Sequence, residues 1–240
     1  MVAVLIAALA PRMLAMAGGT MLVKDINPGP SDGFAGFAAV AGNALFFAGD
    51  DGTSGRELWK SDGSSGGTVM VEDINPGPED GFGNHVTVLA DNNLFYFGGT
   101  PPDSGTEPWV SDGTAGGTYL LHDYVSDWES PTSLYYGIAH DGTVFFLASL
   151  MDGMGSIEFW RTDGTPGSTQ LIENVGYDPD NFHSFRIYND KVYFFNDSEP
   201  TDYLWVTDGT PEGTEVIFDD TAGEGYFHYF DVVNNHLLFT

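Results

Sequence analysis

Acidic side chains recur at one position of an internal repeat, and their type and spacing suit them to bind a metal ion. They lie five residues after a repeated threonine, as Asp25, Asp73, Asp123, Asn174 and Asp219. If the segments that carry them line a central channel, four carboxylates and one amide would form a ring. Ligation by oxygen alone is typical of Ca²⁺, or of Mg²⁺ that keeps some of its waters. The alternative is that each side chain caps the loop that follows it.

A second recurring position carries imidazole and phenol groups. Six residues before each predicted hairpin turn the sequence has His85, Tyr135, His183 and His228 in four of the repeats. Together with Trp128, in a long acidic loop, these side chains could contact a saccharide or another polar ligand. Because the histidines belong to separate repeats, we do not expect them to bind one zinc ion. The alternative is that they are half-buried and hydrogen-bonded within the protein.

A ten-residue unit that occurs four times must position these groups. It starts at Trp59, Trp109, Trp160 and Trp205, and its Asp-Gly pair contains Asp62, Asp112, Asp163 and Asp208. We expect each Asp to accept backbone N–H groups in a tight turn in which Gly adopts a positive φ. A Trp at one fixed strand position indicates packing between neighbouring repeats, and stacking on a sugar is the alternative.

The repeat period predicts the fold class. The four Trp are 50, 51 and 45 residues apart, and four short strands in such a period are typical of a β-propeller blade. We predict an all-β propeller of about five four-stranded blades, with a β-solenoid of stacked hairpins as the alternative. A single domain would span residues 18–240. Its units would start near residues 20, 68, 118, 169 and 214, each with the strand after the threonine, and the last would be incomplete.

Residues 1–17 differ from the rest of the chain. The apolar run from Val2 to Ala10 is too short to span a bilayer as a helix. Ala15-Met16-Ala17 resembles a signal-peptidase cleavage site. The segment is therefore either a shortened signal peptide or a strand, Val2 to Leu9, that closes the last blade.

Charge narrows the range of partners. The chain has 7 Lys and Arg against 35 Asp and Glu, a net charge of −28 over 240 residues. Nucleic acids and anionic membranes are thereby excluded as partners, because binding phosphate requires clustered cations. Cations and cationic partners fit this charge. The absence of cysteine excludes disulfides and thiolate metal sites.

One stretch carries a resemblance to a known family. Residues 56–63 (Arg-Glu-Leu-Trp-Lys-Ser-Asp-Gly), then Gly67-Thr68 and residues 71–77 (Val-Glu-Asp-Ile-Asn-Pro-Gly), resemble the bacterial ELWxxDGT repeat family. The resemblance covers residues 19–240, is clear in the first two units and is degraded later. It implies an exported protein at the cell surface or outside the cell. The family has no agreed enzymatic residues.

Three functions follow as expectations. The first is a non-enzymatic exported module for binding or adhesion, stabilised by divalent cations such as Ca²⁺ and without an organic cofactor. The second is a lectin-like propeller that binds saccharides, and the third is a glycoside hydrolase with carboxylates over the channel. The sequence has no nucleophile elbow, zinc-protease motif or phosphate-binding loop. Because a catalytic site is asymmetric, repetition favours a protein that is not an enzyme.

Overall fold

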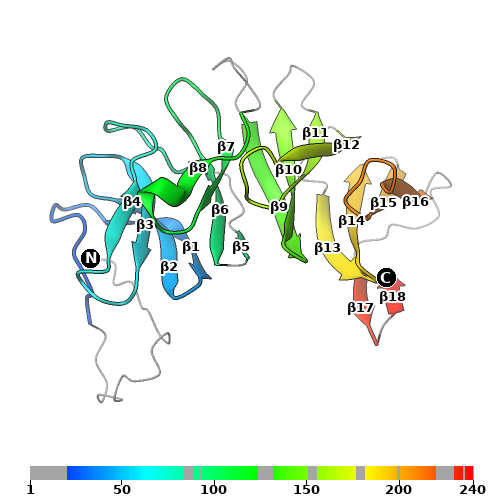
Figure 1. Ribbon diagram of the computed structural model, residues 1–240, viewed down its shortest axis with the longest axis horizontal. Coiled ribbons are helices and arrows are strands. Elements are labelled where there is room, and N and C mark those ends of the chain that lie inside the picture. Colours follow the sequence, from blue (N-terminus) through cyan, green and yellow to red (C-terminus); the bar gives the residue numbers. More distant parts are fainter. Residues whose placement is uncertain are drawn as a thin grey trace. The chain divides into compact units, whose positions relative to one another are not determined.

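The protein is an all-β chain of short antiparallel strands (Figure 1). The computed structural model describes residues 21–83, 89–91, 93–123, 132–150, 156–176, 182–198, 201–219, 230–234 and 236–239. In these ranges the only helical segment is the 3-10 turn η1 (Ala115–Gly117), so no described helix is long and apolar enough to cross a membrane.

The strands form four four-stranded sheets and one two-stranded sheet, in each of which consecutive strands are hydrogen-bonded neighbours. The first sheet contains β1 (Phe34–Ala41), β2 (Ala44–Asp50), β3 (Arg56–Ser61) and β4 (Val69–Glu72). The second contains β5 (Leu89–Asp91), β6 (Leu94–Gly99), β7 (Glu107–Ser111) and β8 (Thr118–Leu120). The third contains β9 (Thr132–His140), β10 (Thr143–Leu150), β11 (Ile157–Thr162) and β12 (Gln170–Gly176). The fourth contains β13 (Phe182–Tyr188), β14 (Lys191–Ser198), β15 (Thr201–Thr207) and β16 (Glu215–Asp219), and the last contains β17 (Phe230–Val233) and β18 (His236–Phe239).

The sheets belong to two compact units, the first with sheets one and two and the second with sheets three, four and five. Within each unit the first strands of successive sheets contact each other, β1 with β5 and β13 with both β9 and β17. Successive four-stranded meanders that meet at their first strands are the arrangement of a β-propeller, and not of a solenoid. The predicted fold class is confirmed, and the number of blades stays a prediction.

The predicted unit starts near residues 20, 68, 118, 169 and 214 are out of phase with the sheets. The sequence suggested that the strand after each threonine comes first, but β4, β8, β12 and β16 are the fourth strands of their sheets. The strand that carries Trp is therefore the third. A tandem repeat has the same period wherever it is cut, so only the hydrogen bonding between strands reveals where a sheet begins.

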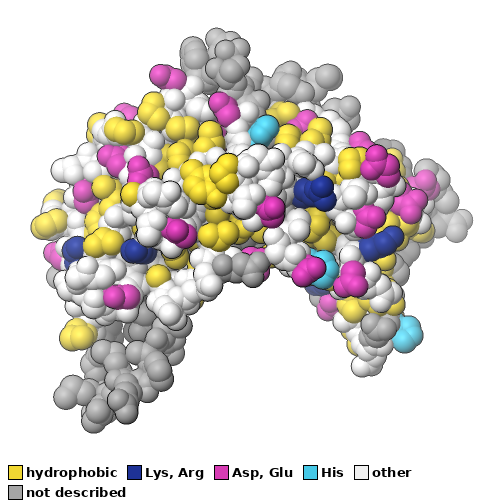
Figure 2. Space-filling model, viewed as in Figure 1, with side chains coloured by type: hydrophobic (Ala, Val, Ile, Leu, Met, Phe, Trp, Pro, Cys, Tyr) yellow, Lys and Arg dark blue, Asp and Glu magenta, His cyan; other side chains and the backbone are white. Residues whose placement is uncertain are grey.

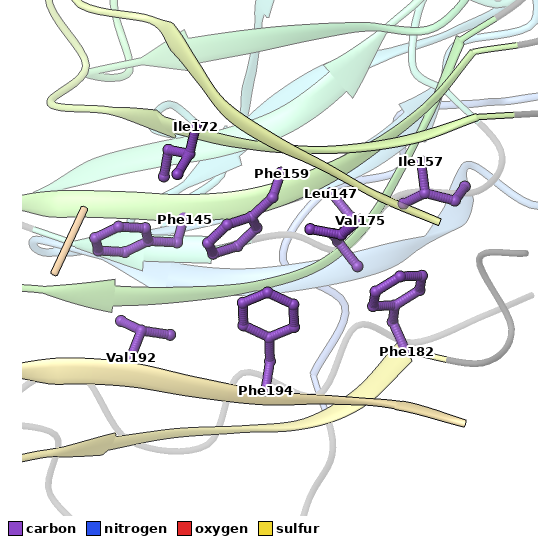
Figure 3. Packing of buried hydrophobic residues seen from close by; sticks show 9 residues of the cluster. All are labelled: Phe145, Leu147, Ile157, Phe159, Ile172, Val175, Phe182, Val192 and Phe194. Carbon is purple, nitrogen blue, oxygen red and sulfur yellow. The ribbon is translucent and has the colours of Figure 1, made fainter. Parts of the chain in front are cut away.

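Apolar side chains fill the space between successive sheets. In the second unit one cluster joins sheets three and four, and it consists of Phe145, Leu147, Ile157, Phe159, Ile172, Val175, Phe182, Val192 and Phe194 (Figure 3). The rings of Phe159 and Phe194 lie 4.6 Å apart. In the first unit Phe46 and Phe95 stack across sheets one and two at 5.0 Å. These contacts explain why the second strands are continuous apolar runs.

The repeated Trp packs closely against the second strand of its own sheet. A Cβ added at Gly49 would lie 2.7 Å from Cδ1 of Trp59, and one added at Gly99 would lie 2.6 Å from Cδ1 of Trp109. Glycine is thus required wherever the indole meets the backbone. Trp59 and Trp160 are only 6% and 8% exposed. They belong to the interior, where a sugar could not stack on them.

Replacing Phe159 by Ala should cost about 3–5 kcal/mol of folding free energy, because it leaves a cavity in the cluster between sheets three and four. Leu171→Ala, at a side chain that is 43% exposed on the outer strand β12, is the control and should cost far less. Urea unfolding of both variants measures the difference. Equal losses would contradict the assignment of Phe159 to the core.

Candidate functional site

The turns between the third and fourth strands share one hydrogen-bond pattern. The carboxylate of Asp62 accepts the backbone N–H of Ser64 at 2.9 Å, and the equivalent bond recurs at Asp112, Asp163 and Asp208. Hydrogen bonds from hydroxyl and backbone groups hold the pKa of all four carboxyls below the usual range. These four groups are engaged in their own turns, which makes them poor candidates for ligand binding.

Hydroxyl pairs close the same turns. Ser61 Oγ and Thr68 Oγ1 lie 2.7 Å apart, and Ser61 Oγ also accepts the N–H of Gly63. The same pairs recur as Ser111 with Thr118 and as Thr207 with Thr214. A Cβ at Gly67 would lie 2.0 Å from the Asp62 carboxylate. The repeated Ser/Thr, Asp, Gly and Thr are therefore parts of one turn.

The residues of the predicted metal ring lie at the ends of fourth strands. Asn174 pairs with Glu158 in the third sheet, and Asp219 pairs with Tyr203 in the fourth. In the first sheet Leu58 pairs with Glu72, so that Asp73, the next residue, is placed opposite Glu57. Each of these ring residues thus faces the residue two positions before Trp in its own sheet.

The ring hypothesis requires that these strands be innermost, but the first strands hold that place. Its geometric basis is therefore wrong, and the structure does not bring the five side chains together. Asp25 and Asp123 are exposed. Within the described ranges no three His, Asp or Glu side chains cluster so that they could hold a metal ion. Stabilisation by Ca²⁺ stays a prediction.

Glu57 is the most unusual acid in the structure, and the sequence analysis did not single it out. Its side chain is fully buried. One carboxylate oxygen, Oε2, accepts the N–H of Ile74 at 2.8 Å. The other, Oε1, and Oδ1 of Asp73 are buried without a hydrogen-bond partner. A Cβ at Gly81 would lie 2.4 Å from the Glu57 carboxylate, so the loop after β4 wraps closely around it.

Burial raises the pKa of Glu57 from its ordinary value of 4.5 to about 7, and the negative charge of Asp73 adds to the rise. The hydrogen bond from Ile74 opposes it. A signal for this site was present in the sequence, because Glu57 precedes Leu58-Trp59 inside a buried strand. Glutamate is almost never fully buried without a partner.

The equivalent positions of the other sheets differ. Glu107 is also fully buried, but its Oε1 accepts the hydroxyl of Ser104 at 3.3 Å. Glu158 accepts the indole N–H of Trp160 at 3.0 Å and pairs with an amide, Asn174. The fourth sheet has Tyr203 instead of Glu. Among the described sheets, therefore, only the first places two acids with unpartnered buried oxygens opposite each other.

The predicted ligand-binding residues fall partly outside the described residues. His85, Trp128 and His228 lie in segments that are not described, as do the side chains of Tyr135 and His183. The backbone places Tyr135 on β9 and His183 on β13, which are contacting first strands.

The first strands are irregular at this repeat position. Their pairing shifts register between Phe34 and Ala38 in β1, next to Tyr135 in β9, and between His183 and Arg186 in β13.

The backbone in two of these bulges is left-handed. It has positive φ at Gly36 (103°) and Phe37 (45°) in β1 and at Ser184 (62°) in β13. Positive φ is uncommon for residues other than glycine. Bulges redirect side chains and are frequent beside functional sites. The sequence analysis found this position but not its backbone distortion.

The first unit also contains two hollows. A cavity of about 310 Å³ lies between residues 22–34 and the first sheet, and its lining includes Asp25. A groove of about 700 Å³ lies between sheets one and two and is lined by Lys60, Asp62 and Asp112. Lys60 Nζ donates to the carbonyl oxygen of Gly113 across this groove. Acidic side chains on the face shown in Figure 2 are scattered rather than gathered in one patch.

Comparisons with known proteins define the fold but not the family. No family model and no curated protein matches the sequence. A structure from a study of two prolyl endopeptidases is similar over 93% of this chain, with a TM-score of 0.56 and 15% identity. This chain spans 34% of that one.

Two further solved structures are more distant. A nidogen/laminin complex has a TM-score of 0.42 and 9% identity, over 82% of this chain and 67% of that one. An α-L-arabinofuranosidase from Clostridium thermocellum has a TM-score of 0.34 and 16% identity, over 82% and 76%. The likeness to the prolyl endopeptidase structure bears on the fold alone.

Glu57→Gln should stabilise the protein at pH 8 but not at pH 4, measured in the presence of a chelator. The folded-state pKa of Glu57 lies above the unfolded value, so its stabilising contribution is complete below about pH 4.5 and is lost as the pH rises through 7. A shift of this size corresponds to on the order of 3 kcal/mol at pH 8, and a glutamine does not ionise. Urea unfolding at both pH values provides the measurement.

The control for this comparison is Glu215→Gln, at an exposed residue of β16, which should have similar stability at both pH values. An equal effect of Glu57→Gln at pH 4 and pH 8 would contradict the assignment of a raised pKa.

Proposed function

We propose that this protein is a non-enzymatic binding or adhesion module of the ELWxxDGT repeat type, exported to the cell surface or the extracellular space. The observation that carries the proposal is the bulge that recurs in the first strands of sheets one, three and four. Its repeat position holds Gly36, Tyr135 and His183, so similar backbones present different side chains. Such variation on a fixed scaffold suits a binding surface.

The strand order supports one edge of the sheets as the binding edge. In an antiparallel meander the β1–β2 and β3–β4 turns lie at one edge, and the longer β2–β3 and β4–β5 connections lie at the other. First strands begin at the second edge. Gly36 is the third residue of β1, Tyr135 the fourth of β9 and His183 the second of β13. The bulges therefore lie near the longer loops, where binding residues are most often found.

Two further observations support a role in binding rather than catalysis. The repeated aspartates accept backbone N–H groups in their own turns. Similar groups recur from sheet to sheet, whereas catalysis depends on a nucleophile, acid or base held in one asymmetric arrangement. The net charge of −28 supports stabilisation by divalent cations, because such self-repulsion destabilises a compact chain. Saccharide is the ligand class that the His and Tyr positions favour.

A glycan array with the parent protein tests this proposal, and His183→Ala should weaken the binding of any retained glycan about 3–10-fold through the loss of one hydrogen bond. His140→Ala is the matched control, because His140 ends β9 at the opposite edge and pairs with Asp190. Its binding should equal that of the parent. Incubation with aryl glycosides accompanies the array, and turnover of any substrate would overturn the non-enzymatic assignment. Failure to bind any glycan would overturn the saccharide class.

A further inference from the structure

We propose that Glu57 and Asp73 bind one Ca²⁺ ion between the start of β3 and the loop that follows β4. This inference rests on the cation stabilisation included in the proposed function and gives it a location. It replaces the ring of five residues with a pair inside one sheet.

The first argument is geometric. Residues opposite each other on paired antiparallel strands have Cβ atoms about 4.5–5.5 Å apart, and the pairing of Leu58 with Glu72 puts Glu57 and Asp73 in such positions. Oε1 of Glu57 and Oδ1 of Asp73 are both buried and lack a hydrogen-bond partner. Two carboxylate oxygens that face each other without donors have the arrangement that a shared cation would complete.

The second argument is electrostatic. A buried carboxylate is costly unless it is paired or bound to a metal. The described cationic side chains of the first unit are Lys24, Arg56 and Lys60, and each has a contact elsewhere. Arg56 forms an ion pair with Asp80 at 3.1 Å. Lys24 and Lys60 donate to backbone carbonyl groups.

The third argument concerns the type of ion. Carboxylate oxygens are hard ligands, and Ca²⁺ accepts six to eight oxygens in a flexible geometry that can include backbone carbonyls and water. Mg²⁺ demands a nearly ideal octahedron and keeps most of its waters, which suits a fully buried glutamate poorly. The loop from Ile74 to Gly81 lies close to the Glu57 carboxylate and has backbone carbonyls to contribute.

The other sheets provide internal controls. Glu107 accepts the hydroxyl of Ser104, Glu158 faces the amide Asn174, and Asp219 faces Tyr203. None of them combines two opposed acids with two unpartnered oxygens within the described residues. The first sheet should therefore hold the only strong site of this type, and Asp219→Asn is a matched substitution at the same repeat position.

Thermal melting of the full chain at pH 7.5 tests the site, with chelator, with Ca²⁺, and with NaCl at equal ionic strength. Ca²⁺ at about 100 times its Kd should raise the Tm of the parent by roughly 5–10 °C, and NaCl should not. Glu57→Gln and Asp73→Asn should each abolish this rise, while Asp219→Asn retains it. Calorimetric titration of the parent with Ca²⁺ should give one strong site per chain, absent from Asp73→Asn.

The outcomes separate this inference from the proposed function. An equal Ca²⁺-dependent rise in the parent and in both variants would overturn the site but not cation stabilisation. No rise in any protein would overturn both, and it would leave the glycan result to decide the binding role. If Glu57→Gln fails to fold, Asp73→Asn decides, because Asp73 is only half-buried.

Discussion

The structure depends on the burial of aromatic and aliphatic side chains between successive four-stranded sheets. Phe46 on Phe95 and Phe159 on Phe194 are examples of this contact. A single sheet of this kind has apolar side chains on both faces, so it needs a neighbour on each side to keep them from water. The other features follow from close packing, including the glycine at residue 49 that admits the indole of Trp59.

The fold class could be predicted because its signals are local. Asn, Asp and Gly in the turns have conformational preferences that do not depend on the rest of the chain, and the apolar runs between them are strand-length. The phase could not be predicted in the same way. Thr68 and Thr118 begin the most recognisable part of the repeat, yet they precede fourth strands. Hydrogen bonding between strands distant in sequence sets this phase, and a periodic pattern does not encode it.

The candidate site shows the consequence of that uncertainty. Asp73 was recognised as a recurring acid, but an incorrect phase assigned it to a channel instead of to a position opposite Glu57. Glu57 itself was read as part of a repeat signature, because the burial of one residue depends on which strands cover it. The inner-strand position of His183 and Tyr135 was found by counting from the hairpin turn. The distortion of the backbone there depends on register, which the sequence pattern does not specify.

The acidic side chains of the first sheet fall into two physical classes. Asp62 and its equivalents are exposed and stabilised by backbone N–H groups, so their charges cost little. Glu57 is buried with a second acid beside it, and only one of its two oxygens has a donor. Substitution of one member, as by Asn174 or Tyr203 in later sheets, removes the conflict without changing the strand pairing. A repeated backbone can therefore carry a distinct site in one sheet, because each site depends on two opposed residues and not on the repeat as a whole.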